Sequence, residues 1–250
     1  MITRKSTREI EQMQKAGDLL VQVHKEIAKL IKPGITTLEI DAFVDKLLEE
    51  HGAIPEQKGY NGFPYATCAS INDEICHGFP RAEALKDGDI VTIDMVVNLD
   101  GGLADSAWTY AVGNVDEKGL RLMDVTKKSL YKGIEQARAG NRIGDIGHAI
   151  QVYAEAEGFS VVRDFTGHGI GPTIHEDPLI PHYGLPNKGL RLKPGMVITI
   201  EPMLNEGDWP SQVDSNNWTA RTVDGGRSAQ YEHTIVITEG DPIILTEQDR

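Results

Sequence analysis

Apolar side chains recur every three to four residues over the first fifty positions, which is the spacing of one buried helix face. Ser6-Thr7-Arg8-Glu9 has the form of a capping box, so we expect a first helix that opens here and ends at Pro33-Gly34. A second helix should begin at Thr36 or Thr37 and stop near Gly52, because a glycine often follows the last helical turn.

The pattern changes over residues 90–108, where apolar and polar residues alternate as in a strand with one buried face. Asp100-Gly101-Gly102 interrupts the alternation, so the stretch predicts a β-hairpin with a tight glycine turn. Asp94 and Asp105 fall inside the two strand patterns. Strand interiors usually exclude aspartate, so each is either a solvated edge residue or part of a site that offsets the cost of its burial.

The rest of the chain predicts a second pair of helices and several short strands. The helices cover about 117–139 and 143–157, the second stopping near Gly158. The strands are expected near 66–70, 76–78, 159–162, 197–201, 220–223 and 231–238.

The second half of the chain repeats the first. LKDGDIVTID at 85–94 matches LKPGMVITIE at 192–201 in Leu, Lys, Gly, Thr and Ile, and each copy ends in a carboxylate. Gly34, Ile40 and Gly52 recur as Gly140, Ile146 and Gly158 at nearly the same offset. Chance would explain one such match, but three favour a true repeat. We therefore expect a single domain over 1–250, built of two pseudo-symmetric αβ halves at about 1–112 and 113–250, in which Asp94 and Glu201 are equivalent.

Composition narrows the possible partners and location. The net charge of −13 argues against nucleic acid or an anionic membrane as the main partner, and it suits a site that binds cations. No apolar run approaches the roughly 18 residues that cross a bilayer, and the N-terminus lacks the apolar core of a signal peptide. Two cysteines, Cys68 and Cys76, indicate a reducing compartment, so we expect a cytoplasmic protein.

Four carboxylates stand in predicted strands: Asp94, Asp105, Glu201 and Glu232. Within about 4 Å of one another, each pair would repel by roughly 4 kcal/mol at an effective dielectric of 20. Such a cluster persists only when protonated or when it surrounds cations. Two divalent ions would balance the four charges, and carboxylates with one imidazole suit Mn, Fe, Co or Zn. Ions held in this way activate water for hydrolysis.

The histidines differ in how well their surroundings suit a ligand. His168 lies in TGHGIG, where three glycines allow close backbone approach and unusual dihedral angles, and we favour a metal ligand over a plain loop residue. His77 and His175 suit substrate binding as well as metal binding. The remaining five carry no ligand signal: His24, His51, His148, His182 and His233.

Seven strings together give the chain a specific resemblance that spans almost its whole length: CHGFP, VTIDMVV, GLADSAWTY, TGHGIG, HEDP, MVITIEPML and SAQYEHTIVIT. The sequence resembles the type I methionine aminopeptidases. The resemblance implies an α+β, pita-bread fold, in which two pseudo-symmetric αβ halves form a curved antiparallel sheet with helices on the outside. It implies removal of the initiator methionine from nascent polypeptides when the second residue is small, near the ribosome, by a monomer that binds neither nucleic acid nor membrane.

The resemblance also implies roles for individual residues. Two divalent ions (Co, Mn, Fe or Zn) would be held by Asp94, Asp105, His168, Glu201 and Glu232, of which Asp105 and Glu232 bridge both ions. Glu201 would shuttle a proton, while His77 and His175 would steady the reacting carbonyl and the scissile amide. Substrate would also contact a methionine pocket lined by Tyr60, Phe63, Cys68, His77 and Trp218. Ordinary packing is the alternative for the aromatic residues, and Ile174 replaces a common pocket-side aromatic, which leaves the pocket shape open.

Three other readings compete with this one. A prolidase or Xaa-Pro aminopeptidase shares the fold but usually carries an extra N-terminal domain. A binding protein on this fold would lose metal ligands, whereas all five positions are kept. A non-haem iron oxygenase could use the H-x-D fragment of His175-Glu176-Asp177, but the amphipathic helices argue against its β-rich scaffold.

Overall fold

Four α-helices form where the helical patterns place them. The computed structural model describes residues 2–248. The helices are α1 (Thr7–Leu30), α2 (Thr37–Glu50), α3 (Glu117–Gln136) and α4 (Ile143–Ala156). The capping box is present at α1, where the Ser6 hydroxyl accepts from the Glu9 N–H and the Glu9 carboxylate accepts from the Ser6 N–H. Thr36 and Glu39 repeat this arrangement at α2.

The strands are more numerous and shorter than the sequence pattern suggests. They are β1 (Ile54–Pro55), β2 (Cys68–Ile71), β3 (Glu74–Cys76), β4 (Ile90–Leu99), β5 (Gly102–Ala111), β6 (Ser160–Val161), β7 (Gly167–Gly169), β8 (Glu176–Ile180), β9 (Val197–Ile200), β10 (Met203–Asn205), β11 (Ser211–Val213), β12 (Ala220–Thr222), β13 (Ser228–Gln230), β14 (His233–Val236) and β15 (Ile243–Ile244), with a 3₁₀ turn η1 (Tyr60–Gly62). The strand expected at 76–78 ends at Cys76, because His77 has a positive φ of 56° and turns out of the ladder.

The β4–β5 hairpin forms as predicted. Leu99 pairs with Gly102, so Asp100 and Gly101 make a two-residue turn. Their φ angles of 51° and 85° are both positive, as a type I′ turn requires. This long hairpin is the centre of the first sheet, in which β4 also pairs with β1 and β2.

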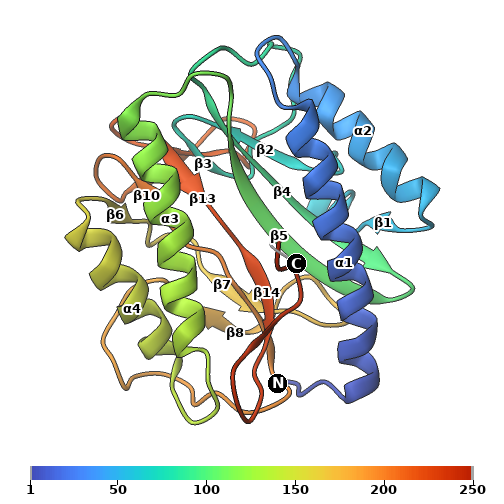
Figure 1. Ribbon diagram of the computed structural model, residues 1–250, viewed down its shortest axis with the longest axis vertical. Coiled ribbons are helices and arrows are strands. Elements are labelled where there is room, and N and C mark those ends of the chain that lie inside the picture. The colour runs from blue at the N-terminus through green and yellow to red at the C-terminus, as the bar shows by residue number, and fades with distance from the viewer. Residues whose placement is uncertain (1, 249–250) are drawn as a thin grey trace.

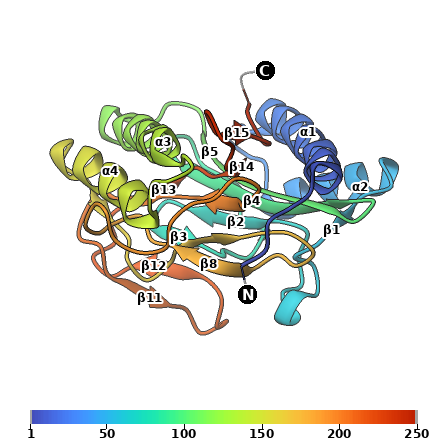
Figure 2. The same ribbon diagram turned by 90° about the horizontal axis from the view of Figure 1, so that it is seen from below.

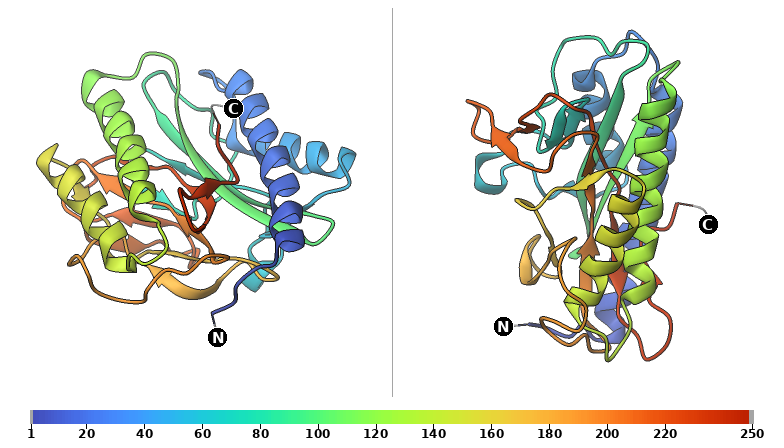
Figure 3. Two further views of the ribbon diagram at one scale, coloured as in Figure 1. Left: turned by 60° about the horizontal axis from the view of Figure 1, so that its bottom comes forward. Right: turned by 90° about the vertical axis from the view of Figure 1, so that its left-hand side faces the viewer.

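The helices lie together on one side of the strands (Figures 1 and 2). Every strand pairing in residues 2–248 is antiparallel, and the second half supplies a five-stranded sheet of order β15-β14-β9-β7-β8. Two three-stranded sheets, β13-β10-β6 and β11-β12-β3, complete the strand layer. Figure 3 shows the layer edge-on, with the β11–β12 hairpin on the side away from the helices.

Two separate hydrophobic cores join helices to sheets, one in each half of the chain. Leu20 and Ile27 of α1 pack with Ile93 of β4, and Ile146 of α4 packs with Ile198 of β9. All five side chains are fully buried. At about 25 cal/mol per Å² of apolar surface, each such side chain contributes roughly 1.5–3 kcal/mol relative to exposure. These cores hold the strands rigidly, which lets one face of each strand carry polar side chains.

The internal repeat is visible in equivalent hydrogen bonds. Gly34 N–H donates to the Leu85 carbonyl at 2.8 Å, and Gly140 N–H donates to the Leu192 carbonyl at 3.0 Å. Thr36 and Arg142 make matching isolated bridges to Ala84 and Arg191. The two αβ halves of the expected fold are therefore present. The boundary at about 112 and the assignment of 1–250 to one domain stay predictions, and residues 1, 249 and 250 of that span lie outside the described part.

A membrane-crossing helix would have to be both long and apolar. Among residues 2–248 no helix meets both conditions.

Candidate metal centre

The β4–β5 hairpin presents Asp94 and Asp105 on the same face. Asp94 pairs with Ala107 and Asp105 pairs with Val96, so the two aspartates are diagonal neighbours across the ladder. The Asp105 side chain is buried, and both carboxylates line the same cavity. The alternative that these aspartates are solvated residues at a strand edge is therefore wrong for both.

Strand β7 consists of His168 and its two flanking glycines. The sequence suggested a loop with unusual dihedral angles, but Gly167 and Gly169 have no positive φ. Close approach is the reason for both glycines. A Cβ on Gly167 would lie 2.4 Å from the Thr199 carbonyl oxygen, and one on Gly169 would lie 2.3 Å from that of Asp177. His168 is thus held between two tightly packed strands.

Glu201 and Glu232 lie at breaks between strands rather than inside strands, which corrects the expected strands 197–201 and 231–238. Glu201 follows β9, and Pro202, which lacks an N–H, ends the ladder before β10 begins in another sheet. Glu232 lies between β13 and β14, which belong to two different sheets. Its N–H donates to the Ala107 carbonyl of β5 at 2.9 Å. Both glutamates therefore stand where the chain passes from one sheet to the next.

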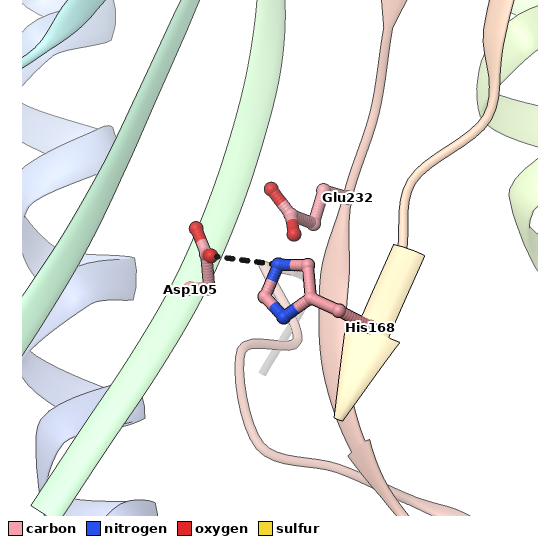
Figure 4. Close-up of side chains that lie close together, drawn as sticks. All are labelled: Asp105, His168 and Glu232. Carbon is pink, nitrogen blue, oxygen red and sulfur yellow. Dashed lines mark ion pairs between the residues drawn. The ribbon is translucent and has the colours of Figure 1, made fainter. Parts of the chain in front are cut away.

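Three side chains converge on one point from β5, β7 and the break before β14 (Figure 4). One ligand atom each of Asp105, His168 and Glu232 lies within 4.8 Å of the others. The His168 Nε2 is 3.6 Å from Asp105 Oδ2 and 3.5 Å from Glu201 Oε1, too far for hydrogen bonds. Two atoms that each ligate one ion at about 2.1 Å in tetrahedral geometry stand about 3.4 Å apart, so these separations fit a metal ion.

The backbone fixes the orientation of the His168 ring. Its Nδ1 donates to the Gly169 carbonyl oxygen at 2.9 Å, which leaves Nε2 facing the carboxylates as the atom that would ligate an ion once it is deprotonated. Burial alone would lower the pKa of His168, but the Asp105 and Glu201 carboxylates outweigh it and raise the pKa to about 9. Without a cation the site holds this ring as an imidazolium.

Several carboxyl groups of the cluster have pKa values above those of isolated carboxylic acids. Burial, with the Asp105 and Glu201 charges, raises the pKa values of Asp94 and Glu232 well above their usual range. Burial raises the pKa of Glu201 to about 7, although His168 acts in the opposite direction. Asp105 Oδ1 and Glu232 Oε1 are buried with no hydrogen-bond partner among residues 2–248. Unpartnered oxygens in a crowded acidic cluster are the donor set of a divalent cation site.

Polar residues to which the sequence assigned no role orient these ligands. The Thr199 hydroxyl donates to Glu201 Oε1 at 2.9 Å and accepts from the His168 N–H. Gln230 Nε2 donates to Glu201 Oε2 at 3.2 Å. The buried His182, for which the sequence gave no role, accepts the Glu201 N–H on Nε2 at 3.1 Å. The strand positions of Thr199 and Gln230 next to the ligands could have indicated these two residues, whereas His182 lies after the end of β8 and had no such signal.

Two cavities meet at the carboxylate cluster. The larger, of about 580 Å³, is lined by Asp94, Asp105, His168, Glu201 and Glu232. The smaller cavity has a volume of about 230 Å³. Four residues line both cavities: His77, Asp94, Asp105 and His175. The smaller one is below the roughly 300–1,000 Å³ of pockets for drug-sized ligands, so it suits a single side chain.

The smaller cavity gathers the five residues expected at a methionine pocket, and Ile174 and His175 line it as well. The five are Tyr60, Phe63, Cys68, His77 and Trp218. The Phe63 and Trp218 rings pack edge to face at 5.1 Å between centroids. Burial raises the pKa of the Cys68 thiol, which therefore stays neutral beside the cluster. Ile174, the position at which the sequence left the pocket shape open, is buried and lines this cavity.

His77 and His175 stand between the two cavities. Burial lowers the pKa of His77 to about 4, and burial lowers that of His175 as well, so both rings are neutral at pH 7. The His175 Nδ1 lies 3.0 Å from the Tyr60 hydroxyl, and its ring is 4.4 Å from the His168 ring. Each ring is thus placed to meet a molecule that reaches from one cavity into the other.

The chain matches metallopeptidase family M24 over residues 11–239. It is 52% identical to methionine aminopeptidase 1 of Bacillus subtilis (strain 168), covering 98% of this chain and 99% of that protein. It is 50% identical to methionine aminopeptidase A of a Synechocystis strain, covering 98% and 97%. The crystal structure of methionine aminopeptidase from Rickettsia prowazekii superposes with a TM-score of 0.97 at 43% identity, covering 99% and 100%. A prolidase from Pyrococcus horikoshii has a TM-score of 0.77 at 22% identity and shares the fold, with 99% of this chain covering 64% of it.

Proposed function

The chain belongs to metallopeptidase family M24, and on this premise we propose that it is a metal-dependent methionine aminopeptidase that removes the initiator methionine from polypeptides. Full-length similarity to methionine aminopeptidases at 52% and 50% identity supports the activity. One observation carries the proposal. A cavity for a single apolar side chain opens directly onto a buried carboxylate–histidine cluster.

Two divalent ions are the cofactor that we propose, drawn from Co, Mn, Fe and Zn. Asp105 and Glu232 would bridge them, Asp94 would hold one, and His168 with Glu201 would hold the other. The unpartnered oxygens of Asp105 and Glu232 support the bridging roles, because each of these residues has a second oxygen to offer a second ion. When bound, the ions supply a water-derived nucleophile at neutral pH and polarise the scissile carbonyl.

The protein's own residues position the substrate and move the proton. The methionine side chain enters the cavity of Phe63, Cys68 and Trp218, whose aromatic and sulfur-rich wall suits a polarizable thioether. The rest of the polypeptide lies in the larger cavity. Glu201 would take a proton from the attacking water at its carboxylate and deliver it to the leaving amine. Of the neutral His77 and His175, one would donate a hydrogen bond to the reacting carbonyl oxygen and the other would accept one from the N–H of the scissile amide.

The second residue of the substrate sits where the two cavities meet, between His77 and His175. We propose that this narrow position restricts it to small side chains. We also propose that the substrates are nascent polypeptides close to the ribosome, that the protein acts as a monomer in the cytoplasm, and that neither nucleic acid nor membrane is a partner. The net charge of −13 supports the last point.

Metal-stripped protein, reloaded with one divalent ion at a time, tests the proposal. The substrates are three peptides that differ only in their N-termini: Met-Gly, Met-Leu and Ala-Pro. We expect free methionine from Met-Gly alone, and only with added metal. Cleavage of Ala-Pro instead would identify a prolidase-like specificity, and no cleavage with any ion by the folded protein would contradict a catalytic role.

A further inference from the structure

Residues 170–175 connect β7 to β8, and two of them, Ile174 and His175, line the smaller cavity. Behind residues 171–172 lies a separate void of about 100 Å³ that opens to solvent and is lined in part by Lys5, Met13, Gly171 and Pro172. Ile170 and Ile174 pack in a buried apolar cluster, whereas the part of the segment between them borders this open space.

An ion pair with little exposure adds a further constraint at the end of the segment, where Glu176 also pairs with Gly169 in the β7–β8 ladder. The Lys5 ammonium lies 2.7 Å from Glu176 Oε2, and the two side chains are only 4% and 15% exposed. Thr3 adds a hydroxyl hydrogen bond to the same oxygen at 3.0 Å and also accepts from Lys5. Glu176 directly follows His175, so the pair holds the end of the segment.

The N-terminal segment is itself anchored. The Lys5 N–H donates to the Gly195 carbonyl at 2.7 Å, and Arg4 Nε donates to the Pro194 carbonyl at 2.6 Å. Gly171 presses against Lys5 so closely that a Cβ there would lie 2.5 Å from Lys5 Cε. Lys5 therefore touches both ends of the segment, at Gly171 and at Glu176.

We propose that Lys5 is a positioning residue, which sets the place of Ile174 and His175 through its ion pair with Glu176. This inference rests on the proposed function, because it assigns those two residues to the substrate pocket. Removing one partner of a buried pair leaves an uncompensated charge. In Lys5→Met the Glu176 carboxylate turns toward water, and the segment shifts into the void behind it.

The expected kinetic result is a loss in substrate binding rather than in metal binding. With metal-loaded full-length protein and the Met-Gly peptide, Lys5→Met should lower kcat/KM by about tenfold, mainly through KM, since small misplacements of binding groups are costly. Glu176→Gln keeps the shape of the side chain, removes its charge and should act in the same direction. The affinity for the metal alone should stay within about twofold, because no proposed ligand moves.

Arg227→Met is the matched control. Arg227 pairs with Asp116 and Glu206 on the other half of the molecule, and its side chain is 18% exposed. Its loss should lower thermal stability as Lys5→Met does, but it should leave KM unchanged. A KM that rises equally in Arg227→Met would assign the effect of Lys5 to general destabilisation and overturn the proposal.

Hydrogen exchange gives a readout that does not depend on activity. Amides of residues 170–176 should exchange at least about tenfold faster in Lys5→Met and in Glu176→Gln than in the wild-type protein, with those of α3 unchanged. Equal exchange in the wild type and in whichever of the two variants folds would overturn the proposal. If the wild-type protein releases no methionine, the proposed function fails, and exchange alone decides the role of Lys5.

Discussion

Asp105 lies at the centre of the cluster, beside His168 and Glu232 and bonded through its backbone to β14. Its backbone N–H and carbonyl both bond the Thr234 hydroxyl, which joins β5 to β14. Its carboxylate faces His168, and one of its oxygens is buried without a partner in the described residues. An ionised group in this position costs several kcal/mol unless a cation compensates it.

Asp105→Asn should therefore separate stability from metal binding. The amide keeps the shape but removes one charge from a repelling cluster, so the metal-free protein should be at least as stable as the wild type in urea. Affinity for added metal, measured by titration calorimetry, should fall by at least about 100-fold, the upper range for losing even an outer contact of a ligand. Asp124→Asn, on the exposed face of α3, is the control. Wild-type affinity in Asp105→Asn would disprove its role as a ligand.

At the level of elements, strand β7 explains why His168 needs glycine on both sides. The strand is squeezed between β8 and β9, and the neighbouring carbonyl oxygens occupy the space that a methyl group would need. The sequence motif thus encodes a distance between strands rather than a backbone conformation.

Gly169→Ala tests this reading. Forcing β7 and β8 apart should lower the free energy of unfolding by about 1–3 kcal/mol, the usual cost of overpacking, and should weaken metal binding by moving His168. Urea unfolding with metal titration measures both. Gly240→Ala is the control, since a Cβ there meets nothing closer than 3.9 Å. Equal stability of the two variants would mean that β7 can move aside without cost.

Periodicity predicted the helices, the β4–β5 hairpin and the repeat, because each depends on spacing within one element. It misjudged Glu201 and Glu232, since apolar alternation continues past the points where the chain changes sheets. Pairing between distant strands decides those breaks, and a single sequence does not encode it locally. Lys5 went unnoticed for the same reason, because its partner Glu176 lies 171 residues away.

At the scale of the whole molecule, the site joins the two halves. Asp94 and Asp105 come from the first half, and His168, Glu201 and Glu232 come from the second. Bonds from β5 to the chain around Glu232 run along the same seam, including that of the Ser106 hydroxyl to the Glu232 carbonyl. An ion held by these residues would tie the halves together, so we expect metal binding to stabilise the fold as a whole.

Metal binding should consequently release protons and strengthen as the pH rises. The pKa of His168 is raised to about 9 and that of Glu201 to about 7, so near pH 7 the metal-free folded site holds protons that an ion must displace. These raised pKa values stabilise the metal-free folded protein fully at a pH below the pKa values of the same groups in the unfolded chain. That stabilisation is lost as the pH rises through about 7 for Glu201 and about 9 for His168. Affinity should thus rise by about tenfold per pH unit for each proton displaced between pH 6 and 8.

Calorimetry in two buffers of different ionisation enthalpy measures the protons released, and thermal unfolding with and without chelator measures the linked stability. Metal at 100 times its Kd should add about 2.7 kcal/mol, and the gain at a fixed metal concentration should be larger at pH 8 than at pH 6. Affinity that does not change with pH, with no proton release, would mean that the carboxylates and His168 do not form the binding site.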